Sequence, residues 1–259
     1  MSTIKFTVIG SGNVAFHLGS RLMELGCSCN AVVSRNPTTA AQLTQQLHAP
    51  FKNIELIDQS SDLILICVPD HEIKNVIASL PSEALQQYVV HTSGNETLDV
   101  FGNSEGKFIN LYPLQSFSKN LEVDWSQIPI FYESNHDLNP ELYNLFCRVG
   151  NRLILFNPNI RKYLHLSAVF TNNFVNLNYL AAFSILNQCE LDNTVLSALA
   201  NYTTKKAFLL GAKKAQTGPA KRNDFNTIQK HLTCLESEFP EFVELYKTQT
   251  ELIQKLFIS

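Results

Sequence analysis

The sequence predicts an α/β domain with a mostly parallel, doubly wound sheet, followed by an all-α domain. In residues 1–157, short apolar runs alternate with segments of helical periodicity, the pattern of parallel strands joined by helices. Beyond residue 157 no convincing strand pattern follows. The chain has 259 residues, more than one domain usually holds. We therefore expect a first domain over residues 1–157 and a second over 158–259.

Short apolar runs supply the strands of the predicted sheet. They cover residues 4–10, 30–35, 62–69, 88–94, 107–114, 128–134 and 152–157. Helical patterns separate most of them, over residues 13–26, 37–48, 71–80 and 139–150. Pro37 suits the first turn of its helix and Gly26 suits a C-cap. In the second domain we expect helices over residues 160–188, 194–215, 224–237 and 241–257.

Composition narrows the class of protein. The formal net charge is −3, with 45% apolar and 17% charged residues and no long basic run, which argues against nucleic acid as a partner. No run of about 18 apolar residues predicts a membrane span, and the N-terminus does not read as a signal peptide. The six cysteines form no CxxC pair, so no metal site is expected. These features favour a cytoplasmic protein.

A glycine turn follows the first predicted strand. Gly10, Gly12 and Ala15 have the spacing GxGxxA and lead directly into a helix. Gly10 permits a tight turn, Gly12 lets the backbone approach a pyrophosphate, and Ala15 allows close packing of helix on strand. The free N–H groups of the helix start would bind the anion, with Ser11, Asn13 and Val14 at the same turn. The alternative is a glycine-rich turn without a ligand.

The end of the second predicted strand indicates which dinucleotide binds. NAD sites usually have Asp or Glu there, which bind the ribose hydroxyls. This sequence has Ser34 and Arg35 instead. A hydroxyl and a guanidinium would bind the 2′-phosphate that a carboxylate repels, so NADP(H) is favoured over NAD(H). The alternative is that Arg35 is an ordinary solvated surface residue.

Two more strand ends should face the same ligand, because ligands of such sheets lie beyond the carboxyl ends of the strands. One end carries Val68 and Pro69, and the other carries Thr92 and Ser93, which leave room for ribose and nicotinamide. His91 alternates with Thr92 along its strand, and we expect it to point into the packing of the sheet.

The motifs GSGNVA, SR, CVPD, HTSG and YPLQSFS, followed by an all-helical half, resemble a family. They are similar to the NADP oxidoreductases of the 6-phosphogluconate dehydrogenase and pyrroline-5-carboxylate reductase superfamily. The resemblance covers nearly the whole chain. It implies a Rossmann-like domain and a helical domain like the C-terminal domain of 6-phosphogluconate dehydrogenase. The nearest branch is a bacterial one whose C-terminal domain has no assigned function.

The resemblance also implies an activity. Hydride would pass between the nicotinamide and a small C=O or C=N substrate held between the domains, and the helical domain would form a homodimer. In the β-hydroxyacid dehydrogenases of this superfamily, a Lys and an Asn four residues later do the chemistry on the first long helix. Here that register offers His165 and Val169, so the pair is absent and a standard hydroxyacid dehydrogenase is not favoured.

Polar residues on the first long helix are the candidates for catalysis. In a regular α-helix, which turns about 100° per residue, His165, Asn172 and Asn176 fall within about 20° of one direction. Facing the cofactor, His165 would be a general acid, and Asn172 would orient the substrate carbonyl or the nicotinamide amide. Asn176 would contact substrate. The alternative is a buried hydrogen-bonded seam between helices or subunits.

Other candidates complete the predicted site. Ser93 is a second catalytic candidate, and Gln115 is a substrate contact in a segment that resembles one bordering the family's substrate site. Arg222 could clamp a carboxylate or phosphate of an anionic substrate, or its loop could simply join two helices with Asp224 as N-cap. The leading hypothesis is an NADP(H)-dependent oxidoreductase. The alternatives are a non-catalytic NADP(H) sensor and hydride exchange with a deazaflavin cofactor.

Overall fold

The short apolar runs of the first half form the strands of one sheet. The computed structural model describes residues 3–57 and 60–258, and the chain divides into two compact units, 1–172 and 173–259. The sheet has seven strands in the order β2-β1-β3-β4-β5-β6-β7. The strands are β1 (Lys5–Ile9), β2 (Ser28–Val33), β3 (Leu63–Ile66), β4 (Tyr88–His91), β5 (Lys107–Pro113), β6 (Pro129–Ser134) and β7 (Arg152–Leu155). Every neighbouring pair is parallel except β5 and β6, which confirms the mostly parallel sheet.

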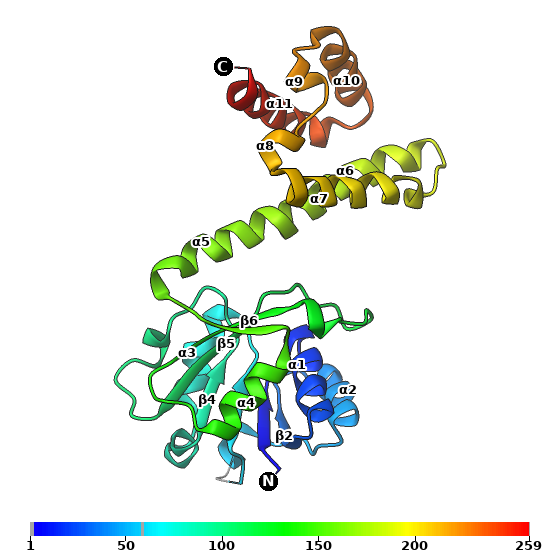
Figure 1. The fold of residues 1–259 in the computed structure, drawn as a ribbon. Helices are drawn as coiled ribbons and strands as arrows, with labels where there is room; N and C mark the ends of the chain where they lie inside the picture. Colours follow the sequence, from blue (N-terminus) through cyan, green and yellow to red (C-terminus); the bar gives the residue numbers. More distant parts are fainter. Residues whose placement is uncertain (1–2, 58–59, 259) are drawn as a thin grey trace. The chain divides into compact units, whose positions relative to one another are not determined.

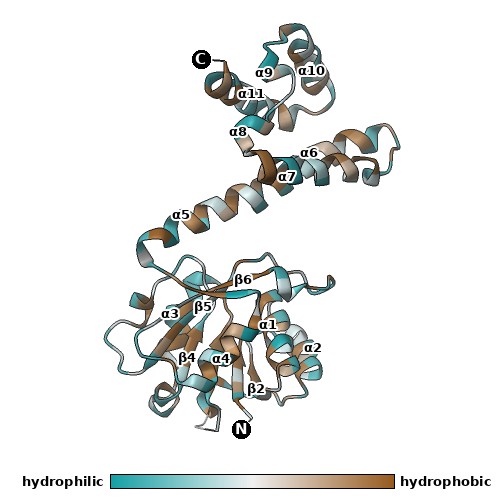
Figure 2. Ribbon diagram, viewed as in Figure 1, coloured by the Kyte–Doolittle hydropathy of each residue, from teal (hydrophilic) through white to brown (hydrophobic). Residues whose placement is uncertain are grey.

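Helices cover both faces of this sheet (Figure 1). They are α1 (Asn13–Glu24), α2 (Pro37–Leu47), α3 (Asp70–Ala78) and α4 (Pro140–Val149). Side chains of β3 alternate between the two cores: Leu63 and Leu65 pack with α1, α2 and α4, while Ile64 and Ile66 pack with α3. This alternation is the reason that β3 is apolar throughout, because both of its faces are buried. Figure 2 shows the strands largely in brown and the surrounding helices with both teal and brown residues.

Beyond residue 157 the described chain contains helices and no strand, as predicted. They are α5 (Pro158–Ala168), α6 (Phe174–Gln188), α7 (Ser197–Leu210), α8 (Ala212–Ala215), α9 (Pro219–Arg222), α10 (Phe225–Glu238) and α11 (Val243–Phe257). The single helix expected over residues 194–215 is wrong, because Gly211 has φ of +81° and separates α7 from α8. The change from strands to helices falls at Pro158, whereas the compact units meet at residues 172 and 173.

A wide turn interrupts the first long helix of the second half. Residues Val169–Asn173 are π-helical and join α5 to α6. The regular α-helix that the sequence analysis assumed here is therefore wrong. A π turn holds about one extra residue, which shifts later positions by about 100°. The α-helical count that placed Asn172 and Asn176 in one direction with His165 therefore does not hold through this turn.

Candidate functional site

The turn after β1 requires glycine at its first position. Gly10 has φ of +105°, and a Cβ added there would lie 2.2 Å from the carbonyl oxygen of Cys67. Any side chain would push β1 away from β3 at this point. At Gly12 nothing lies within 4 Å of an added Cβ, so the backbone there borders open space. Ala15 is fully buried and allows α1 to pack closely on the sheet.

Helix α1 presents unpaired backbone N–H groups beside this turn. Gly12 is its N-cap, and the first bond inside the helix runs from the N–H of Phe16 to the Gly12 carbonyl at 3.0 Å. The amides of Asn13, Val14 and Ala15 therefore have no acceptor within the helix. No acidic residue lies in the first turn of α1, so the positive end of the helix dipole is left for an anion.

A hollow of about 460 Å³ lies beside the carboxyl ends of β1, β2 and β3. Four predicted cofactor-binding residues line it: Gly10, Ser34, Arg35 and Val68. Other polar residues of this lining were not predicted from the sequence, namely Lys52, Asn53, Glu55, Glu72, Asn75 and Ser79. The hollow fits the position that parallel α/β sheets use for nucleotides.

Three hydroxyl groups meet at the edge of this hollow. The Ser11 hydroxyl lies 2.7 Å from that of Ser34 and 2.5 Å from that of Thr39. Asn36 caps α2 by accepting a hydrogen bond from the Thr39 N–H at 3.1 Å, with Pro37 at the first turn as predicted. These hydrogen bonds connect the glycine turn to the end of β2 and to the start of α2.

Arg35 has an anionic partner in the hollow. Its guanidinium lies 3.1 Å from the carboxylate of Glu72 on α3, and its side chain is 80% exposed against 19% for Glu72. The hydrogen bond from Arg35 is the main reason that the pKa of Glu72 is lowered, and a hydrogen bond from Asn75 lowers it further. Arg35 is thus exposed, but it forms an ion pair with a residue that lines the hollow. Glu72 and Asn75 face the hollow together because they lie three residues apart on one helix.

The ends of β3 and β4 are tied together. The Thr92 hydroxyl donates to the carbonyl of Ile66 at 3.4 Å, and Pro69 is the N-cap residue of α3. Ser93 is buried, and its hydroxyl oxygen accepts the N–H groups of Asn95 at 3.0 Å and Glu96 at 2.9 Å. In this structure the Ser93 side chain therefore stabilises the turn after β4.

A buried polar network lies next to that turn. The Nδ2 of Asn110 donates to the carbonyl of Ser93 at 2.7 Å and lies 3.2 Å from Nδ1 of His91. The guanidinium of Arg161, on α5, donates to Oδ1 of Asn110 at 3.2 Å, and it also pairs with Glu133 on β6. His91 is 0% exposed, as expected from its place in the strand. The pKa of His91 is lowered to about 3, mainly by burial and in smaller part by the charge of Arg161.

None of Asn110, Glu133 and Arg161 was recognised in the sequence. Arg161 is buried and lies 4.0 Å from the centre of the Phe156 ring. It also donates to the carbonyl of Glu96 at 2.9 Å. The one signal was Asn110, a polar residue inside an apolar strand pattern, because buried amides need partners.

The segment that follows β5 is fastened to α1. Asn13 donates from Nδ2 to the carbonyl of Phe117 at 2.8 Å, and Nε2 of His17 lies 2.8 Å from the carbonyl of Ser118. The Asn13 side chain is thus engaged with protein, and only its backbone N–H faces the glycine turn. Gln115, the predicted substrate contact, is exposed and accepts the N–H of Ser116 at 2.8 Å.

The candidates on the helices have fewer contacts. His165 is half-buried, and its Nδ1 is a fully buried atom without a hydrogen-bond partner in the described chain. Asn172, Asn176 and Arg222 are exposed. Asp224 is the N-cap of α10, as the alternative for that loop expected, and its carboxylate accepts the N–H of Thr227 at 3.1 Å. Asn176 and Arg222 belong to the second compact unit, and His165 and Asn172 to the first.

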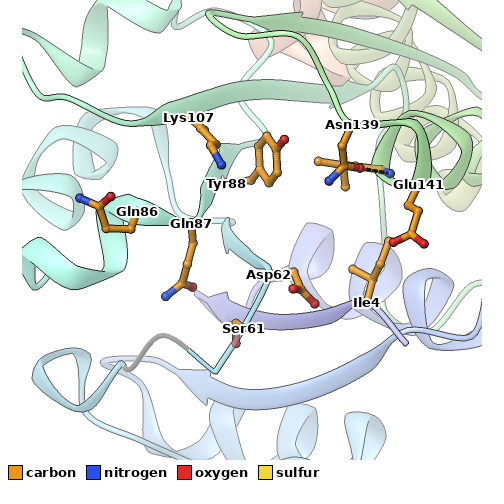
Figure 3. Close-up of a pocket in the computed structure, with 10 residues that line it drawn as sticks. Ile4, Ser61, Asp62, Gln86, Gln87, Tyr88, Lys107, Asn139 and Glu141 are labelled. Atoms are coloured by element: carbon orange, nitrogen blue, oxygen red, sulfur yellow. Dashed lines mark hydrogen bonds between the residues drawn. The ribbon is translucent and has the colours of Figure 1, made fainter. Parts of the chain in front are cut away.

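A second hollow, of about 230 Å³, lies at the opposite edge of the sheet (Figure 3). Two of its charged groups, Asp62 and Lys107, already have partners. The carboxylate of Asp62 accepts the backbone N–H of Lys5 at 2.8 Å, and the ammonium of Lys107 lies 5.0 Å from the centre of the Tyr88 ring. Because ligands of parallel sheets bind at the carboxyl edge, we assign no role to this hollow.

Within residues 3–57 and 60–258, three or more His, Cys, Asp or Glu side chains nowhere gather as metal ligands would. None of the helices described is both long and apolar enough to span a membrane.

Comparison with known proteins now decides the family. Residues 5–94 match a model described as "NADP oxidoreductase coenzyme F420-dependent", and residues 128–253 match a domain of unknown function, DUF2520. A solved structure titled "putative NADP oxidoreductase", from Bacteroides fragilis, is 30% identical, covers 98% of each chain and has a TM-score of 0.87. The chain belongs to this NADP oxidoreductase family. The resemblance drawn from its motifs is thereby confirmed.

More distant structures share the fold alone. A reductive aminase from Aspergillus terreus, in complex with NADPH and ethyl levulinate, is 15% identical with a TM-score of 0.70 and covers 98% of this chain and 93% of its own. A pyrroline-5-carboxylate reductase from Coxiella burnetii is 16% identical with a TM-score of 0.59, covering 98% and 97%. A search of curated proteins finds none that matches the chain.

Proposed function

We propose that the chain is an NADP(H)-dependent reductase that acts on a small carbonyl or imine compound. The observation that carries the cofactor part is the end of β2, where Ser34 and Arg35 replace the acidic residue of an NAD site. The clustered hydroxyls of Ser11, Ser34 and Thr39 add polar groups at the start of α2. Hydroxyls, a guanidinium and a helix N-terminus together suit a phosphate.

The carboxylate of Glu72 must be neutralised before a phosphate can bind in this hollow. It lines the same hollow as Arg35 and would repel a 2′-phosphate if it were unpaired. The Arg35 guanidinium neutralises it, and its exposed end is free to turn toward a phosphate in addition. Lys52 adds a second cation to the lining. The pyrophosphate would bind at the amides of Gly12, Asn13 and Val14, where Gly12 leaves room.

The chemistry would take place beyond the ends of β3 and β4. Bound NADPH supplies a hydride for the substrate carbon. Val68, Pro69, Thr92 and Ser93 would form the protein surface under the nicotinamide half, with Thr92 and Ser93 fixed by their hydrogen bonds. The catalytic assignments of His165, Asn172 and Ser93 stay predictions, as do the substrate contacts of Asn176, Gln115 and Arg222. The unpartnered Nδ1 of His165 supports a hydrogen-bonding role for that residue.

We also propose that the chain forms a homodimer through its helices. In the single chain neither α6 nor α7 buries a side chain fully, although both carry large apolar residues, as Figure 2 shows. The most exposed on α7 are Phe208, Leu209, Leu199 and Tyr202. So large an exposed apolar surface is unusual for a monomer and typical of a subunit interface.

Hydride exchange with a deazaflavin is a second candidate, favoured by the description of the matching model. That match covers only residues 5–94, the segment that holds the glycine turn and Arg35. It therefore supports the nicotinamide dinucleotide more than the deazaflavin. Adding oxidised deazaflavin to the assay below, with NADPH and no other acceptor, separates the two.

Consumption of NADPH tests the proposal. The purified protein is mixed with NADPH and with members of a panel of ketones, keto acids and cyclic imines, and absorbance of the reduced nicotinamide is followed. We expect oxidation that depends on one class of acceptor. Tight NADPH binding without turnover of any acceptor would favour the sensor. Absence of NADPH binding would remove the proposal altogether.

A further inference from the structure

Tyr112 holds a rigid position at the carboxyl end of β5. Its ring stacks on Phe156 with centroids 6.0 Å apart and planes 11° apart. On another side the ring rests on the backbone of Gly94. A Cβ added at Gly94 would lie 2.5 Å from Cζ of Tyr112 and 2.9 Å from its hydroxyl. The phenol end therefore lies directly against the turn that follows β4.

The segment beyond Tyr112 cannot easily swing away. Pro113 ends β5, and the carbonyls of Phe117 and Ser118 are hydrogen-bonded to side chains of α1. The ring is thus held by β5 on one side and by a fastened segment on the other. A side chain that must meet a reacting atom benefits from such fixed placement.

The Tyr112 hydroxyl is available to a ligand. Among the residues that the structure describes, none is hydrogen-bonded to it, and it is not one of the fully buried polar atoms. Burial raises the pKa of Tyr112, and the nearby carboxylate of Asp70 raises it further. The phenol is therefore protonated at neutral pH and can donate.

We propose that the Tyr112 hydroxyl is the proton donor of the reduction, an inference that rests on the proposed function. The nicotinamide half of the cofactor is expected beyond the ends of β3 and β4, and the hydroxyl lies against the turn that follows β4. A proton donor must reach the heteroatom of the substrate while its carbon faces the nicotinamide. An unpartnered hydroxyl at this edge meets that requirement.

The step balances as follows. The substrate carbon gains a hydride from reduced nicotinamide, and the electron pair of the C=O or C=N double bond moves onto the oxygen or nitrogen. The O–H bond of Tyr112 breaks and its proton forms the new O–H or N–H bond. The phenolate takes up a proton from water. The products are the alcohol or amine and the oxidised nicotinamide.

The test is Tyr112→Phe, which removes only the hydroxyl. Because that group makes no hydrogen bond to described residues, the variant should keep the melting temperature and the NADPH affinity of the parent. With the neutral carbonyl or imine acceptor found in the panel, in mildly alkaline buffer, we expect turnover to fall about a hundredfold or more. Tyr132→Phe, on β6, removes a half-buried tyrosine hydroxyl elsewhere and should leave turnover unchanged.

A permanently charged acceptor distinguishes proton transfer from a structural role. N-methyl-1-pyrrolinium needs a hydride but no proton, so Tyr112→Phe should reduce it at the rate of the parent. Binding of the neutral acceptor to the NADP⁺ complex, measured by calorimetry without turnover, should weaken about fivefold through the lost hydrogen bond. If turnover of the neutral and the charged acceptor falls equally in Tyr112→Phe, the defect is structural and the proposal is overturned.

Two other outcomes separate this proposal from the proposed function. If the parent turns over no acceptor, the proposed function fails, and the role of Tyr112 fails with it. If the parent is active and Tyr112→Phe matches it, only the role of Tyr112 fails. His165→Ala is measured in parallel. If His165→Ala loses turnover of neutral acceptors only, while Tyr112→Phe keeps it, His165 would be the proton donor instead.

Discussion

The guanidinium of Arg161 donates a hydrogen bond to Oδ1 of Asn110 at 3.2 Å, although 51 positions separate the two residues in the chain. Through this bond α5 is attached to the middle of the sheet. The same Asn110 holds the carbonyl of Ser93, and the same Arg161 pairs with Glu133. The start of α5 and the turn after β4 are therefore fixed by one set of buried contacts.

We predict that Arg161→Met destabilises the protein by roughly 2–3 kcal/mol, because it leaves the carboxylate of Glu133 without its partner. Urea unfolding at neutral pH measures the change. Arg148→Met, which replaces an exposed arginine on α4, is the matched control and should have little effect. Adding Glu133→Gln to Arg161→Met should recover part of the loss. Equal stability of Arg161→Met and the control would show that the network does not hold the fold.

Acid should destabilise the protein through His91. In the folded chain its pKa is about 3, against an ordinary value of 6.5. Between these values the unfolded chain binds the proton and the folded chain does not, so stability falls as the pH is lowered through that range. His91→Gln cannot titrate and should flatten the dependence of the urea midpoint on pH. His71→Gln, a change at an exposed imidazole, is the control; a slope that stays the same in His91→Gln would contradict the prediction.

Arg35→Ala should weaken NADPH binding about tenfold or more, through loss of charge-assisted hydrogen bonds to the 2′-phosphate. NADH, which lacks that phosphate, should bind much as before. Calorimetric titration with both dinucleotides measures the difference. Arg152→Ala, at an exposed arginine at the start of β7, should change neither affinity. A parallel loss for NADPH and NADH in Arg35→Ala would mean that Arg35 does not read the phosphate.

Light scattering coupled to size-exclusion chromatography tests the homodimer. We expect twice the mass of one 29.1 kDa chain. Replacing both Leu199 and Tyr202 of α7 by Lys should give a monomer, because the charges would be buried at the interface. Leu121→Lys changes an equally exposed residue of the first unit and should leave the dimer intact. A monomeric parent would remove the proposal.

Most of the fold could be predicted because its signals are local. Apolar runs became β1, β3 and β4, with limits at most three residues from the expected ones. Gly10 and Ala15 have the geometry that their spacing implied, and Gly10, Ser34, Arg35 and Val68 do line one hollow. These residues act through the backbone turn or strand on which they lie, which sequence periodicity can locate.

What could not be predicted depends on partners distant in sequence or on small changes of helix geometry. The π turn at Val169–Asn173 has no composition that separates it from an α-helix, yet it changes the direction of every later side chain. No role was predicted for Arg161, because its partners Asn110 and Glu133 are 51 and 28 positions away in the sequence. Glu72 was read as part of an ordinary helix, although it is the partner of Arg35.

Titration of the unmodified protein with NADPH and NADH tests the central claim most directly. Heat of binding is recorded for each dinucleotide at the same ionic strength, because contacts to phosphate weaken with salt. We predict that NADPH binds at least about tenfold more tightly than NADH, through Ser34 and Arg35 at the end of β2. Equal affinities, or no binding of either dinucleotide, would contradict it.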